Sequence, residues 1–561
     1  MGTRRSRFLW LLPLLVTIGI TIVTLRWSLQ FGRLSMTASY DDVTYLAESL
    51  SHVHRLKTQG LGTFASELIR LPPHSPLMFV CGLIGFLCIG LHDWAPYTIH
   101  AGVLLLSLVC VSWMARHAGW IARSALVLAA ALLPISLQSI LEFRPAAAAS
   151  LFTAFGCIFI IDRLPTRVWS SRGLRIVALA SLALLAKPSV FPATLALFGL
   201  ACALSISAER LSVATNRAFR PVRSLILASF RLLGTTALFV SPHYLIAGPK
   251  IVRYIAGTLF GSEAAVWSFG SSRLSLAQHF LYYLKGERKL IGWPFFPGLA
   301  LGIAILVVAL AWGTRRVRFQ SLAIAGMVLA TYLIVSINKT KTPFLGLTFF
   351  AFLTVAVFAA LAHVATSNRL KGRPLAAAAL PCGVLLLAII FFRVPLSPIQ
   401  PVTAITRATD SAIRDILSRT IEHAKETSSL VFIPHVGQLN AQLLELEALK
   451  AGVVLRAKTT PFETDPAVYS KWFDASQMVI IADPHADMIS TGFPVTTTLT
   501  TLRSMLDLHP DFALAFERTT PSGGRFSLFI RRPGSPVPPT APQWNAIQLS
   551  ERPNLFGACA A

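Results

Sequence analysis

Long runs of apolar residues, separated by short polar segments, fill most of the first 395 residues of this 561-residue chain. Many of these runs hold no charge and are close to the ~20 residues that a helix needs to cross a bilayer. They do not alternate polar and apolar positions, as the strands of a membrane β-barrel would. The pattern predicts an α-helical polytopic membrane protein.

We expect about eleven membrane spans in residues 1–395. The first run follows Arg4, Arg5 and Arg7 and lacks a convincing cleavage site, so it is predicted to remain as a helix. The apolar run 76–90 is short for a span and is predicted to be a juxtamembrane or re-entrant helix. The expected spans lie near 8–26, 95–115, 124–140, 147–161, 176–187, 189–206, 226–246, 292–312, 320–336, 344–363 and 375–393.

The pattern changes near Pro395, after which short alternating segments replace the apolar runs. The stretch "SAIRDILSRTIEHA" has the period of an amphipathic helix, whereas "SLVFIP", "GVVLRA" and "QMVIIAD" suit short buried strands. Residues 511–533 are predicted to form a hairpin with a glycine in its turn. We therefore expect a small α/β domain over 398–533 and a disordered, Pro-rich tail over 534–561.

The distribution of charge predicts the orientation. Lys and Arg total 50 against 25 Asp and Glu, and most of the excess lies in short loops, as the positive-inside rule describes. The basic N-terminus is then cytoplasmic, in a multi-pass plasma (inner) membrane protein. Residues 27–94, the first outer loop, and the C-terminal domain are placed outside. This distribution needs no nucleic-acid partner.

Asp41 and Asp42 stand out because they closely follow the first span, on the predicted outer side. Several charged or titratable residues are expected in the same layer: His74, Glu142, Arg144, Lys187, Lys339 and Lys341. Carboxylates facing cations at the membrane boundary suit a lipid phosphate as substrate. The cations would stabilise the departing phosphate, and a carboxylate would remove a proton from an attacking hydroxyl.

Four motifs in order, "YDDVTYLAESL", "LPPHSPL", "LEFRPAAAASLFTAFG" and "LLAKPSVFP", resemble those of GT-C glycosyltransferases that use polyprenyl-phosphate sugars. Protein O-mannosyltransferases and lipid A aminoarabinose transferases are the nearest groups. The resemblance implies an inverting transfer in which Asp41 is the catalytic base and Asp42 its neighbour. It also implies that Lys187 matches a lysine of the family. The partners would be a polyprenyl-phosphate sugar, the bilayer, and an envelope glycan, lipopolysaccharide, lipid or protein as acceptor.

One family feature is absent. The family often has an acid in the second outer turn, where this chain has Arg144-Pro145-Ala146, so that acid is missing or replaced by Glu142. No cofactor is expected with certainty, and a divalent metal is left open. Structural roles also remain open: helix capping for the aspartates, mutual pairing for Glu142 and Arg144, and interfacial or topological roles for the lysines.

Two other functions compete with the glycosyltransferase. A transporter or flippase of lipid-linked sugars would place charges near the bilayer midplane and build its site from related broken helices, whereas these charges cluster in the outer layer. A non-catalytic scaffold of the same fold would explain the missing second acid. The residues do not specify the sugar or the acceptor.

Overall fold

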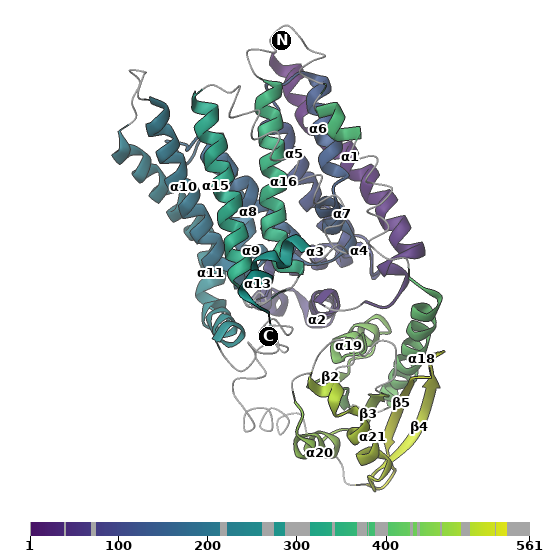
Figure 1. Ribbon diagram of the computed structural model, residues 1–561. Coiled ribbons are helices and arrows are strands. Elements are labelled where there is room, and N and C mark those ends of the chain that lie inside the picture. The colour runs from purple at the N-terminus through teal and green to yellow at the C-terminus, as the bar shows by residue number, and fades with distance from the viewer. Residues whose placement is uncertain are drawn as a thin grey trace.

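In the computed structural model, a bundle of long apolar helices adjoins a smaller α/β domain, and the N-terminus lies at the opposite end of the bundle (Figure 1). The bundle helices are α1 (Gly2–Phe31), α5 (Gly102–Met114), α6 (Trp120–Ala131), α7 (Pro134–Leu141), α8 (Pro145–Asp162), α9 (Ser171–Ala186), α10 (Phe191–Val213), α11 (Val222–Phe260), α15 (Arg315–Ile337) and α16 (Pro343–Ala365). The structure describes residues 2–38, 41–68, 74–213, 221–260, 274–285, 315–338, 341, 343–366, 379, 381–386, 402–426, 430–434, 438–460, 463–483, 494–521 and 523–535.

Within these residues, seven helices are long and apolar enough to cross a membrane, or eight if the bent pair α6 and α7 forms one span. They coincide with eight of the eleven predicted spans. The predicted span 176–187 corresponds to α9, which at 16 residues is too short to count as a span by length. The predicted spans 292–312 and, largely, 375–393 lie outside the described residues. The helical membrane fold is confirmed.

Helix α8 forms the centre of the bundle. Every residue from Pro145 to Ile161 is buried, and the helix packs against α9 and α16. Its first turn is "PAAAA", in which Pro145 suits the first helical position and the small alanines let neighbouring helices approach closely. Helix α8 is therefore uncharged along its length, with Arg144 just before it and Asp162 at its last position.

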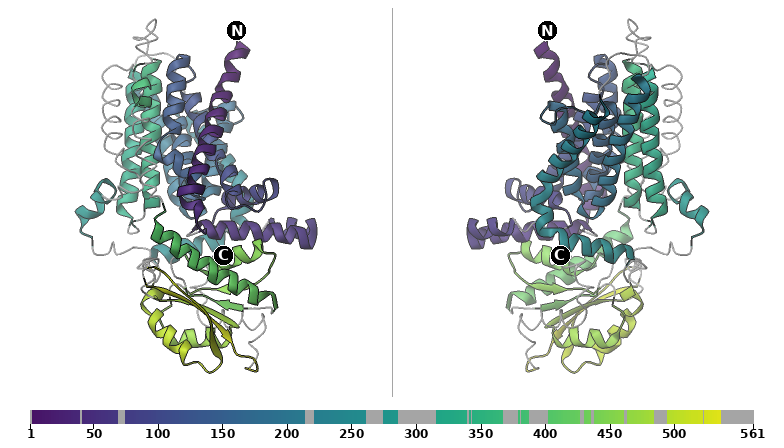
Figure 2. Two further views of the ribbon diagram at one scale, coloured as in Figure 1. Left: turned by 90° about the vertical axis from the view of Figure 1, so that its right-hand side faces the viewer. Right: turned by 90° about the vertical axis from the view of Figure 1, so that its left-hand side faces the viewer.

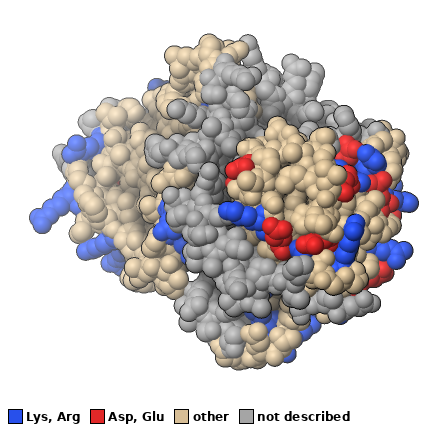
Figure 3. Space-filling model, turned by 90° about the horizontal axis from the view of Figure 1, so that it is seen from below, with Lys and Arg blue, Asp and Glu red and all other residues tan. Residues whose placement is uncertain are grey.

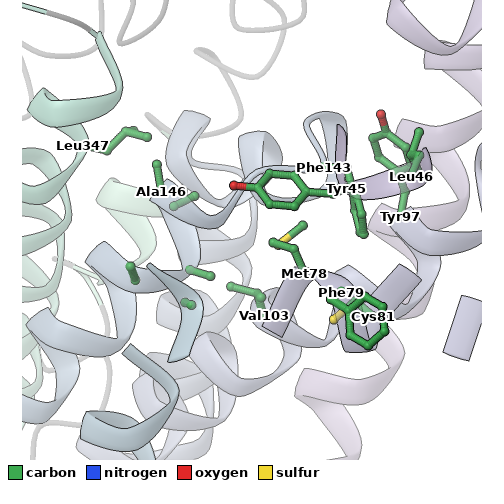
Figure 4. Packing of buried hydrophobic residues seen from close by; sticks show 14 of the residues in the cluster. Tyr45, Leu46, Met78, Phe79, Cys81, Tyr97, Val103, Phe143, Ala146 and Leu347 are labelled. Carbon is green, nitrogen blue, oxygen red and sulfur yellow. The ribbon is translucent and has the colours of Figure 1, made fainter. Parts of the chain in front are cut away.

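Three helices form a layer between the bundle and the α/β domain: α2 (Asp41–Leu68), α3 (Pro76–Cys88) and α4 (Ala95–His100). Figure 2 shows α2 lying across the direction of the bundle helices. Helix α3 is apolar but only 13 residues long, which is short for a membrane span. A Cβ at Gly82 would lie 2.2 Å from Oγ of Ser49, so glycine is needed where α3 meets α2. Figure 4 shows the aromatic and sulfur side chains packed nearby, including Tyr45, Met78 and Phe143.

The α/β domain contains a five-stranded sheet in the order β2-β1-β3-β5-β4. Strands β2, β1 and β3 are parallel, whereas β5 runs antiparallel to both β3 and β4. Its elements are α18 (Ala404–Glu426), β1 (Leu430–Phe432), α19 (Ala441–Lys450), β2 (Arg456–Lys458), α20 (Pro466–Asp474), β3 (Met478–Ala482), α21 (Leu499–Asp507), β4 (Phe512–Thr519) and β5 (Arg525–Arg531).

The predicted hairpin is present as β4 and β5, but the predicted strand "GVVLRA" begins only at Arg456. Gly452, with φ of 73°, and the N–H of Val453 instead close the end of α19. Fifteen of the 25 acidic residues follow Pro395. Acidic side chains seen from below gather on one half of the molecule, interleaved with Lys and Arg (Figure 3). Such a mixed surface is typical of a domain that faces water.

Candidate active site

The two predicted acids lie at the start of α2. Asp41 is the first residue of that helix, and its side chain lies outside the described residues. Asp42 is completely buried. Its carboxylate contacts groups of other elements, so a helix-capping role does not account for Asp42.

Four donors surround the carboxylate of Asp42. Oδ1 accepts a hydrogen bond from Nε of Arg144 at 3.1 Å and lies 3.2 Å from Nη2 of Arg33. Oδ2 accepts hydrogen bonds from the Tyr97 hydroxyl at 2.8 Å and from the Phe143 backbone N–H at 3.0 Å. Both oxygens therefore have two donors each, which satisfies a buried carboxylate.

This environment determines the ionisation of Asp42. Burial by itself would raise the pKa of Asp42, but Arg33, Arg144, the Tyr97 hydroxyl and the Phe143 N–H outweigh it and lower the pKa below its usual value. Asp42 is thus an anion whose lone pairs are already used. Asp42 therefore does not fit the role of a metal ligand. It does not fit the role of a catalytic base either, because protonation of its carboxylate would break the hydrogen bonds and ion pairs that hold it.

The backbone between α7 and α8 brings the second turn to Asp42. Glu142 and Arg144 are both extended, with φ of −127° and −134°, because α7 ends at Leu141 and Pro145 disfavours helical geometry in the residue before it. Oε2 of Glu142 lies 3.9 Å from Nε of Arg144, and Oε1 lies 4.0 Å from Nη1 of Arg33. The structure therefore brings Asp42, Glu142 and Arg144 together, with Arg33 among them.

His74 and Lys187 are each next in sequence to one of two residues that are hydrogen-bonded to each other. The Ser75 hydroxyl caps α3 and also donates to the Ala186 carbonyl at 2.5 Å, which joins the start of α3 to the end of α9. Lys187 follows directly as the half-buried end residue of α9. The ring of His74 contacts Tyr254 of α11 edge-on, with centroids 5.1 Å apart. The two predicted binding residues thus flank one contact between helices.

Lys341 belongs to a third group, and Lys339 lies outside the described residues. Lys341 is buried, and its Nζ donates to the carbonyls of Val335 and Ser336 at the end of α15, at 3.1 and 2.6 Å. Burial lowers the pKa of Lys341 to about 8. These bonds give Lys341 a capping role for α15, so a contact with substrate would have to compete with them.

The sequence patterns did not point to Arg33 and Tyr97. Arg33 lies in the short 3-10 helix Arg33–Ser35, just past the end of α1. A single cation at that place is normally interpreted as marking the end of a membrane span. Tyr97 follows Pro96 in an apolar stretch and looks like an interfacial aromatic. Only the long-range contact with Asp42 reveals either of them.

A further acid, Glu48, shares a face of α2 with Asp41. Seven residues are almost two full turns, so positions 41 and 48 lie one above the other along the helix. Burial raises the pKa of Glu48 to about 7. Within the described part of the chain, no three His, Cys, Asp or Glu side chains are grouped so that they could hold a metal ion.

Two solved structures share this architecture over almost their whole length. ArnT from Cupriavidus metallidurans in the apo state is 14% identical, with a TM-score of 0.55 over 92% of this chain and 97% of that chain. ArnT from the same organism bound to undecaprenyl phosphate is 15% identical, with a TM-score of 0.55 over 94% and 99%. This chain has the ArnT fold.

ArnT is a lipid A aminoarabinose transferase of the GT-C type, so the expected GT-C fold is confirmed. No protein-family model matches the chain, and no curated protein matches its sequence. At this low identity the ArnT likeness shows the fold. The chemistry has to be argued from the residues of this chain.

Proposed function

We propose that this protein is a membrane glycosyltransferase that moves a sugar from a polyprenyl-phosphate carrier to an envelope acceptor on the extracytoplasmic side. One observation carries the proposal: a chain with the ArnT fold places the buried carboxylate of Asp42, the neighbour of Asp41 in sequence, against Arg33 and Arg144 at one end of its helix bundle. One of the two solved ArnT structures binds undecaprenyl phosphate, which supports this class of donor.

In this proposal, Asp41 is the general base. It takes the proton of the acceptor hydroxyl while the hydroxyl oxygen attacks the anomeric carbon from the side opposite the phosphate. The carbon–oxygen bond to the lipid phosphate breaks, and the configuration at that carbon inverts. Asp42 holds Arg33, Arg144 and Tyr97 in place and so sets the start of α2, on which Asp41 lies.

The leaving lipid phosphate needs positive charge. Arg33 and Arg144 are largely balanced by Asp42 and Glu142, since two cations face two anions within 4.0 Å. Lys187, which matches the lysine of the family, is the main candidate for the phosphate, and His74, next to Ser75, is a second candidate. Lys341 and Lys339 are secondary candidates, because the ammonium of Lys341 is engaged at the end of α15.

The test compares envelope glycans and lipid-linked sugars from a deletion strain that expresses wild-type protein, Asp41→Asn or Asp415→Asn. Asp415 lies on α18 with a side chain that is 44% exposed, so it serves as a matched acid-to-amide control. We expect Asp41→Asn to be made at the wild-type level and to lose transfer by about 100-fold or more. The Asp415→Asn strain should keep the wild-type glycan.

Other outcomes would point elsewhere. Transfer at the wild-type rate by Asp41→Asn would overturn the assignment of the base. If the deletion altered the glycan but purified wild-type protein transferred no sugar, a scaffold role would replace the enzyme. Purified wild-type protein that failed to bind undecaprenyl phosphate in nanodiscs would contradict the proposed donor class.

A further inference from the structure

The C-terminal domain holds the segment that leads to the acid pair. This segment, residues 32–40, connects α1 to α2 and is described as far as Ala38. Just before it, the Phe31 carbonyl accepts from the Val402 N–H at 2.8 Å, and the Gln30 carbonyl accepts from Nη2 of Arg407, also at 2.8 Å. The start of α18 is thereby joined to the end of α1.

The strongest contact involves Asp410 and Thr37. Oδ1 of Asp410 accepts from both the backbone N–H and the hydroxyl of Thr37, at 2.8 and 2.7 Å. Both residues are buried, with 4% of each exposed. Oδ2 of Asp410 accepts from Nε of Arg414 at 2.7 Å. Hydrogen bonds to a buried, ionised acceptor are among the stronger ones in proteins, so Thr37 has one well-defined position.

The same segment is held from the bundle side. Arg33 lies on it and contacts Asp42 at 3.2 Å. Thr37 precedes Asp41 by four residues, so a shift at Thr37 would move the start of α2 directly. Asp410 and Asp42 therefore act on one short piece of chain from two different parts of the fold.

A second contact lies farther along the chain. Helix α19 packs along α2, and Nζ of Lys450 at the end of α19 lies 2.5 Å from Asp93 and 2.7 Å from Glu447. Burial alone would lower the pKa of Lys450, but the carboxylates of Asp93 and Glu447 raise it above its usual value. Asp93 lies between α3 and α4, so the C-terminal domain contacts the first loop at both of its ends. Figures 1 and 2 show α2 between the bundle and this domain.

We propose that the C-terminal domain is a clamp on the first loop, in which Asp410 is a positioning residue that sets the place of Asp41 through Thr37. The catalytic consequence rests on the function proposed above. The clamp itself does not, because it is a property of the fold. The C-terminal domain then helps to form the site by fixing the first loop. Its presence can be explained without a role limited to recruiting acceptors.

The first test measures hydrogen–deuterium exchange of the full chain in nanodiscs. Asp410→Ala should raise exchange over residues 33–48 by about tenfold or more, because those amides lose a fixed anchor. Asp415→Ala is the control, since Asp415 lies on the same helix and its partner is Arg518 of the domain itself, at 3.2 Å. Equal exchange in residues 33–48 for both variants would overturn the clamp.

Two milder substitutions at Thr37 test the clamp if the Asp410→Ala variant fails to fold. Thr37→Val keeps the shape and the backbone bond but removes the hydroxyl, whereas Thr37→Ser keeps both donors to Asp410. Faster exchange in Thr37→Val and a wild-type rate in Thr37→Ser would support the clamp. Equal rates in the two variants would contradict it.

Activity separates this inference from the proposed function. If the clamp positions Asp41, Thr37→Val should lower kcat about tenfold with little change in the affinity for undecaprenyl phosphate, and Thr37→Ser should restore it. An altered exchange pattern with unchanged kcat would confine Asp410 to a structural role and overturn its positioning role. If wild-type protein shows neither transfer nor lipid-phosphate binding, the proposed function fails while the exchange result still decides the clamp.

Discussion

The two ends of α8 carry acid–arginine clusters of opposite character. At its start, Arg144 contacts Asp42, whose side chain has no exposed surface. At its end, Asp162 pairs with Arg172 at 2.5 Å, and the side chains are 30% and 17% exposed. The 18 residues between them span about 27 Å, close to the apolar thickness of a bilayer.

The surroundings of the second cluster differ as well. The guanidinium groups of Arg116, Arg175 and Arg172 lie 4.0, 4.7 and 5.1 Å from the ring centre of Trp113. The partly exposed carboxylate of Asp162 can exchange a lost partner for water, whereas the fully buried carboxylate of Asp42 cannot. We infer that the charged side chains at the start of α8 must keep one arrangement, as those of a functional site do. Those at its end can rearrange, as the charges that set membrane topology can.

The largest effect is expected for a substitution that breaks the buried cluster around Asp42. Asp42→Asn removes the charge that balances Arg33 and Arg144 and should cost about 3–5 kcal/mol of folding stability. Asp162→Asn should cost about 1 kcal/mol or less, because both side chains of its pair are partly exposed to solvent. Thermal unfolding of the two variants in the same detergent measures the difference. Equal losses would remove the distinction between the two ends.

A middle-sized effect tests one donor to Asp42. Tyr97→Phe deletes only the hydroxyl that bonds Oδ2 at 2.8 Å, and a bond to a charged group is worth about 1.5–3 kcal/mol. Tyr244→Phe removes a hydroxyl that donates to the neutral Leu184 carbonyl at 3.1 Å and should cost about 0.5–1.5 kcal/mol. If chemical denaturation ranks the two in the opposite order, Asp42 is less dependent on its donors than its burial indicates.

A third effect concerns Glu48 and depends on pH. Its pKa is raised by burial to about 7 from an ordinary 4.5, so its contribution to stability is complete below pH 4.5 and is lost as the pH rises through 7. Glu48→Gln cannot ionise and should therefore gain stability relative to the wild type as the pH rises through 7. Unfolding temperatures measured from pH 5 to 8 provide the check. A constant difference across that range would show that Glu48 does not titrate there.

The contribution of Asp42 to stability has the opposite pH dependence to that of Glu48, which lies on the same helix. Its lowered pKa means that its stabilising contribution is present above the ordinary value of 3.8 and disappears as the pH falls below it. Wild-type stability should therefore decline in acid more steeply than that of Asp42→Asn. Parallel curves for the two proteins below pH 4 would contradict the charged state assigned to Asp42.

Local patterns were enough to predict most of the helices and the final hairpin. The spans could be predicted because apolar length is a property of consecutive residues, although the span predicted from residue 147 begins at Pro145 as α8. The strand "GVVLRA" was predicted to begin before its true start. Its first residues, including Gly452, instead form the turn that ends α19, and the alternation of polar and apolar residues does not reveal this turn.

The sequence by itself determined that this is a helical membrane protein, that Asp41 and Asp42 follow its first span, and that a small α/β domain ends it. Only the tertiary structure decided what those residues contact. It joined Arg33, Tyr97 and Arg144 to Asp42, and Thr37 to Asp410 across 373 positions of sequence. Hydrophobic periodicity depends on neighbours along the chain, whereas the partner of a buried charge is set by which helix ends meet in space.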